Sequence, residues 1–129
     1  MYLFYGDAGT ARTALMATFA LTSSASERVT EVEIEGGKHR LELVSRDQWL
    51  SRRTPSWPND TVIDYHTFEL SEAETEVLGA IINSASPMLV TFHGKYGPVE
   101  KYLEAREYTA LREMMRAWNR TLVPAPHSK

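Results

Sequence analysis

Apolar and polar side chains follow two kinds of pattern along this chain of 129 residues. Seven short segments are compact apolar runs or alternate apolar with polar residues, and two segments have helical spacing. Side chains alternate between the two faces of a strand, and they repeat about every 3.6 residues along a helix. The pattern therefore predicts strands and two helices. The expected strands are 2–5, 13–22, 29–35, 38–44, 61–70, 88–93 and 99–103.

The two helices are predicted in the last third of the chain. Ser71 and Glu74 have the spacing of a capping box, in which each side chain accepts a hydrogen bond from the backbone amide of the other residue. We expect the first helix to begin there and to end before Ser86-Pro87. The second helix is expected over 108–122. Its apolar stripe, which we expect to pack in the core, comprises Leu111, Met114, Met115, Trp118 and Leu122.

The segment 13–22 has more than one interpretation. Leu15, Ala17, Phe19 and Leu21 alternate with other residues, as in a strand, while the alanines also tolerate a helix. With a preceding arginine and a serine-rich continuation, the segment also has weak features of an export signal. The threonines and the turn that follows favour a strand.

A hairpin is predicted where Gly36-Gly37 separates two alternating segments. Both glycines tolerate positive φ, so we expect them to be the central residues of a type I′ turn. Val32 and Ile34 are expected on the buried face. Glu31, Glu33 and Glu35 are expected on the solvent face.

These elements predict one α+β domain over 1–123, followed by a flexible tail at 124–129. We expect an antiparallel sheet of about five to seven strands with both helices packed on one of its faces. No apolar run reaches the roughly 18 residues of a membrane-spanning helix, so no membrane interaction is expected.

Composition and charge narrow the possible functions. The chain has no cysteine, which excludes disulfides and thiolate chemistry and suits a cytoplasmic protein. The net charge is −3, but 38–57 holds five basic and two acidic residues and therefore carries +3, which leaves −6 for the remainder. This asymmetry is the clearest departure from an ordinary composition.

An enzyme is one alternative interpretation. Asp64 and His66 are two residues apart, so on a strand they share a face, and His93 lies on another predicted strand. These three residues are the catalytic candidates of a small hydrolase or nucleotide-processing enzyme. A metal site of the same residues is geometrically conceivable. The sequence contains no phosphate-binding or dinucleotide-binding glycine motif, so we expect no cofactor. Nothing beyond residue type supports a metal site, so we expect no metal either.

The basic segment provides the other set of candidate residues. Large aromatics and cations interleave in a segment whose prolines predict a loop. Such a surface can anchor a protein partner, or it can hold phosphates and stack bases, as in a weak nucleic-acid binder. A third interpretation is a loop fixed to the core by its tryptophans. The residues concerned are Arg46, Trp49, Arg52, Arg53 and Trp57.

Taken together, the sequence favours a small non-enzymatic interaction protein, such as an inhibitor, assembly factor or accessory factor of a bacterium or phage. We expect it to bind another protein, or itself as a homo-oligomer, through the basic segment and the edges of the sheet. The acidic character of the rest of the chain disfavours nucleic acid, because affinity for duplex DNA depends on neutralising phosphates.

Overall fold

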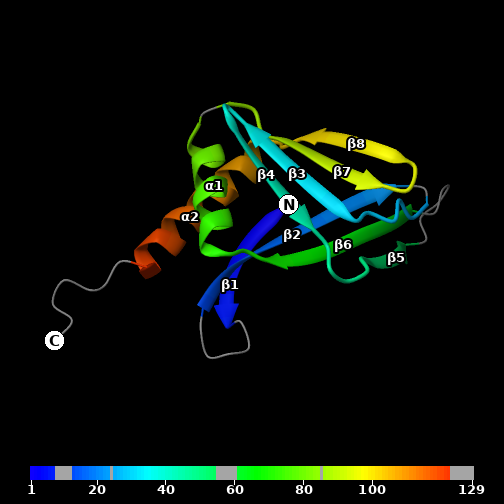
Figure 1. Cartoon of the computed structure of the whole chain (residues 1–129), viewed down its shortest axis with the longest axis horizontal. Helices are drawn as coiled ribbons and strands as arrows, with labels where there is room; N and C mark the ends of the chain where they lie inside the picture. Colours follow the sequence, from blue (N-terminus) through cyan, green and yellow to red (C-terminus); the bar gives the residue numbers. More distant parts are fainter. Residues whose placement is uncertain (8–12, 24, 55–60, 85, 123–129) are drawn as a thin grey trace, which may run out of the picture.

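The computed structural model describes residues 1–7, 13–23, 25–54, 61–84 and 86–122 (Figure 1). Within these residues the chain is an α+β structure with eight strands and two helices. All strand pairs are antiparallel, but they divide into two sheets of four strands, where the sequence predicted one sheet. The predicted tail, 124–129, lies outside the described residues.

The first sheet contains the strands from the start and the middle of the chain. Its strand order is β1 (Tyr2–Asp7), β2 (Thr13–Ser23), β6 (Thr61–Glu69) and β5 (Leu50–Thr54). The predicted strand at 13–22 is thus confirmed as β2, and the helical interpretation is wrong. Leu15, Ala17, Phe19 and Leu21 of this strand are all buried.

The second sheet consists of two hairpins joined side by side. Its strand order is β4 (His39–Val44), β3 (Glu31–Gly36), β7 (Leu89–Gly94) and β8 (Gly97–Tyr102). Val32 and Ile34 are buried, as the alternation predicted. Glu31, Glu33 and Glu35 occupy the opposite face of β3, where they are more exposed.

The core lies between the two sheets. Phe19 of the first sheet contacts Phe92 of the second edge to face, with ring centroids 6.4 Å apart and an angle of 81° between the rings. This is a favourable arrangement for aromatic pairs, and it links the inner faces directly. Each sheet therefore has one face in the core and one outer face, as expected for a pair of antiparallel sheets.

The two helices lie together beside the sheets (Figure 1). Helix α1 (Glu72–Asn83) contacts β4 and β3 of the second sheet, while helix α2 (Ala105–Leu122) contacts β1 of the first sheet as well as α1. The prediction of both helices on one face of one sheet is replaced by this arrangement. The capping box of Ser71 and Glu74 is present at the start of α1, as predicted.

The first hairpin differs from the prediction by one residue. Gly36 still belongs to β3 and pairs with His39, so the central turn residues are Gly37 and Lys38. Among the described residues of this turn only Gly37 has positive φ, at 62°, which fits a type II′ rather than a type I′ turn. Gly36 instead allows close contact between β3 and α1, because a Cβ atom there would lie 2.7 Å from Cγ2 of Ile81 on α1.

Strand β5 was not predicted. The sequence assigned its residues to a loop, whereas Leu50–Thr54 pair with β6 from Tyr65 to Thr61. All five side chains are exposed, so the strand has no apolar alternation that could reveal it. β5 is an edge of the first sheet.

Candidate functional site

Trp49, the central residue of the predicted basic surface, belongs to the core. Its side chain is 5% exposed and packs edge to face on both Phe68 and Phe92. The indole Nε1 donates a hydrogen bond to the hydroxyl of Ser45. Trp49 therefore fixes the segment that precedes β5 to the interior, which matches the third interpretation of the sequence for this one tryptophan.

The arginines of the same segment are exposed. Arg46 lies between β4 and β5, while Arg52 and Arg53 lie on β5 and point to opposite faces of the first sheet. Trp57, the remaining member of the predicted surface, lies outside the described residues. The structure thus separates the predicted set into exposed arginines and a buried tryptophan.

The outer face of the first sheet adds apolar residues beside Arg52. Leu50 of β5 is directly opposite Tyr65 of β6, which is in turn opposite Ala20 of β2. Arg52 is likewise opposite Ile63. Leu50 is 60% exposed, and Ile63 and Tyr65 are half-buried. We call the surface formed by these five residues the β5–β6 patch.

The sequence contained a signal for this patch that the prediction did not use. On strand β6 the side chains of Val62, Asp64 and Phe68 point inward, whereas those of Ile63 and Tyr65 point outward. An ordinary solvent-facing side of a strand carries polar residues, so large apolar residues on both faces indicate that the second face is also covered or is able to bind.

The carboxylate of Asp64 is buried and has hydrogen-bond partners within the protein. Its side chain is 0% exposed, and its Oδ2 accepts a hydrogen bond of 2.8 Å from the backbone amide of Glu27. Its Oδ1 accepts a hydrogen bond from the hydroxyl of Ser51 on β5. The carboxylate therefore joins the segment before β3 to two strands of the first sheet.

The three catalytic candidates do not come together. Asp64 and His66 share the inner face of the first sheet, as their spacing predicted. His93 lies on β7 opposite Glu31, on the outer face of the second sheet, because its neighbour Phe92 points into the core. The arrangement therefore offers no common site for the enzyme alternative that uses these residues.

His66 lines a cleft of about 1060 Å³ between β6, α1 and α2, and neither Asp64 nor His93 lines it. Burial lowers the pKa of His66, and the negative charge of Asp47 opposes this shift in part. The rim of the cleft carries several carboxylates. They belong to Asp47, Glu69, Glu72, Glu74 and Glu76.

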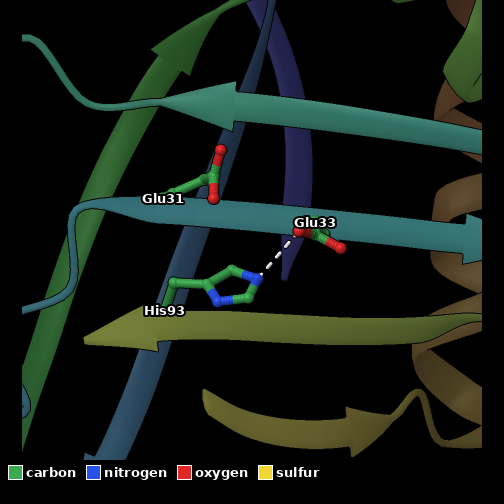
Figure 2. A group of neighbouring side chains, drawn as sticks. All are labelled: Glu31, Glu33 and His93. Carbon is green, nitrogen blue, oxygen red and sulfur yellow. Dashed lines mark hydrogen bonds and ion pairs between the residues drawn. The ribbon is translucent and has the colours of Figure 1, made fainter. Parts of the chain in front are cut away.

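Figure 2 shows a separate group on the outer face of the second sheet, formed by Glu31, Glu33 and His93. One ligand atom from each residue lies within 4.8 Å of the others. Two carboxylates and an imidazole are suitable ligands for a divalent transition metal. Within the described residues this is the only such group.

Glu33 of this group already has two polar partners. Oε1 of Glu33 lies 2.9 Å from Nε2 of His93 and 2.8 Å from Nη2 of Arg40. Burial raises the pKa of Glu33, whereas the hydrogen bonds and charges of Arg40 and His93 lower it. The lowering effects together are larger, so the pKa of Glu33 is below its ordinary value. A metal ion bound by this group would therefore compete with Arg40 for the carboxylate of Glu33.

Comparisons with known proteins provide no identification. No family model, no curated protein and no solved structure matches this chain. No helix among the described residues has the length and apolar character needed to cross a membrane.

Proposed function

We propose that the protein is a non-enzymatic interaction protein that binds another protein through the β5–β6 patch. The observation that carries this proposal is the strong exposure of Leu50 on an outer sheet face, directly opposite Tyr65 and two residues from Arg52 on the same strand. Tyrosine and arginine are enriched among residues that dominate binding energy, and a cluster of apolar residues at a surface is typical of an interface.

The character of the patch supports a protein rather than a nucleic acid as the partner. Arg52 is its only charged residue, and it lies beside two large apolar side chains. Binding to duplex DNA depends on the neutralisation of many phosphates, while the whole chain carries −3. Apolar contact with one oriented arginine fits a protein surface, where a buried apolar centre and a polar rim are usual.

The proposal differs from the sequence prediction in its central residues. Arg52 remains part of the surface, Trp49 is replaced by Leu50, and the neighbouring strand adds Ile63 and Tyr65. A cytoplasmic location and a homo-oligomeric state stay predictions. In the homo-oligomeric case the partner would be a second copy of this chain.

The test is capture of a defined partner by tagged protein from nuclease-treated lysate of the source cells. Leu50→Glu introduces a charge at an exposed position and should abolish the interaction without altering the unfolding curve. Tyr96→Glu is the matched control, because Tyr96 is similarly exposed but belongs to the turn between β7 and β8. Equal capture by both variants, or capture that depends on nucleic acid, would contradict the proposal.

A further inference from the structure

The free edge of β5 is the feature that indicates how a partner is bound. The strand pairs with β6 on one side and with no other strand in the part of the chain that the structure describes. An edge strand presents a row of backbone amides and carbonyls that a second extended chain can pair with. All five side chains of β5 are exposed, so no side chain is withdrawn into the core at this edge.

The other three edge strands are less suited to pairing. Helix α2 contacts β1 and helix α1 contacts β4. Strand β8 contains Pro98, which has no backbone amide to donate. β5 contains no proline and is exposed at every position. The edge of β5 is therefore the most accessible of the four for strand addition.

Charge decides which occupant fits this edge. Arg52 and Arg53 are adjacent, and β5 has no acidic residue. If β5 of a second copy paired with it antiparallel, the arginines of the two copies would lie close together, and like charges on paired strands are destabilising. An added strand with acidic side chains opposite Arg52 and Arg53 would instead be attracted. While it is bound, β5 of a second copy could not pair with this edge.

We infer that the partner adds an extended acidic segment to the edge of β5 as a fifth strand of the first sheet. This inference rests on the proposed function and specifies the chemistry of its partner. The added strand runs antiparallel to β5, as every strand pair among the described residues does. Backbone hydrogen bonds supply affinity, and the side chains of β5 select the sequence.

The register of an antiparallel strand gives the order of its residues. Residues that face Arg53 and Arg52 are acidic, the next residue faces Ser51 and is unrestricted, and the fourth faces Leu50 and is apolar. The segment therefore reads acidic, acidic, any residue, apolar from its N-terminus. The apolar residue would extend the β5–β6 patch, because paired residues point to the same face of a sheet.

The probe is a short capped peptide with Glu-Glu-Thr-Val at its centre, and binding is measured by fluorescence anisotropy. Arg52→Glu with Arg53→Glu should weaken binding by about tenfold or more, since two attractive cross-strand pairs become repulsive. A Lys-Lys-Thr-Val peptide should bind this double variant better than the native protein. Arg116→Glu with Arg120→Glu is the control, because both residues are exposed on α2.

Backbone methylation separates strand addition from other modes of binding. Alternate amides of an added strand point toward β5, so N-methylation of one alternate set should abolish binding and methylation of the other set should not. Equal effects of the two sets, or no saturable binding at about 1 mM peptide, would overturn strand addition. The proposed function fails separately, if Leu50→Glu leaves partner capture unchanged.

Discussion

The indole ring of Trp49 is stacked on the imidazole ring of His66, with ring centroids 5.7 Å apart and an angle of 17° between the planes. The two residues come from the segment before β5 and from β6, and both also contact Phe68 edge to face. This stack fixes the start of β5 to the core. It thereby determines that Leu50, the next residue, begins the exposed strand.

The first prediction concerns the stability that Trp49 provides. Trp49→Ala should lower the free energy of unfolding by about 3–5 kcal/mol, as loss of a buried aromatic side chain does. Trp49→Phe should cost less, because it retains part of the packing. Urea unfolding monitored by circular dichroism measures both. A loss below about 1 kcal/mol for the alanine variant would show that Trp49 is not a core residue.

The second prediction concerns pH. Because burial lowers the pKa of His66 below its ordinary value of 6.5, the unfolded chain binds a proton more readily than the folded protein. Stability should therefore be retained above pH 6.5 and decrease as the pH falls from that value toward the lowered pKa. His66→Phe should remove this part of the pH dependence.

The His66→Phe variant keeps the other three histidines, so it provides the reference for that experiment. Urea midpoints are measured from pH 7.5 to pH 5 for the native protein and for His66→Phe, and the difference between the two curves isolates His66. A difference that is constant over this range would contradict the assignment.

The third prediction concerns the contact of β3 with α1. Gly36→Ala should destabilise the protein by about 1–3 kcal/mol, because the new methyl group would lie 2.7 Å from Cγ2 of Ile81. Ile81→Leu removes that methyl branch at similar volume. The double variant should recover part of the loss. Additive effects of the two substitutions would show that they do not interact.

The fourth prediction concerns the buried carboxylate. Asp64→Ala leaves the amide of Glu27 and the hydroxyl of Ser51 without their acceptor, and should cost about 2 kcal/mol or more. Ser51→Ala removes one of these hydrogen bonds and should cost about 1 kcal/mol. Hydrogen exchange at the Glu27 amide should accelerate in Asp64→Ala. Unchanged exchange there would contradict the assigned hydrogen bond.

Local signals in the sequence predicted most of the individual elements. The capping box placed the start of α1 at Ser71–Glu74, and the alternation of Leu15 to Leu21 identified β2. Both signals depend on residues that are close in sequence. The glycine pair located the first hairpin but not its register, because the role of Gly36 depends on Ile81 of a helix that comes much later.

The arrangement of the strands required contacts that the sequence pattern does not contain. Alternation indicates which residues of a strand face inward, but not whether two strands belong to one sheet. The burial of Trp49 depends on Phe68 and Phe92, one from each sheet. Strand β5 has five exposed residues, and so its pairing with β6 leaves no periodic trace.

The central claim is that the surface around Leu50 contacts a partner protein, and photo-cross-linking at that position tests it most directly. A benzophenone amino acid replaces Leu50 in one variant and the similarly exposed Tyr96 in another. We predict a single adduct of defined mass in irradiated source cells for position 50 and none for position 96. Adducts of equal yield at both positions, or none at position 50, would contradict the account.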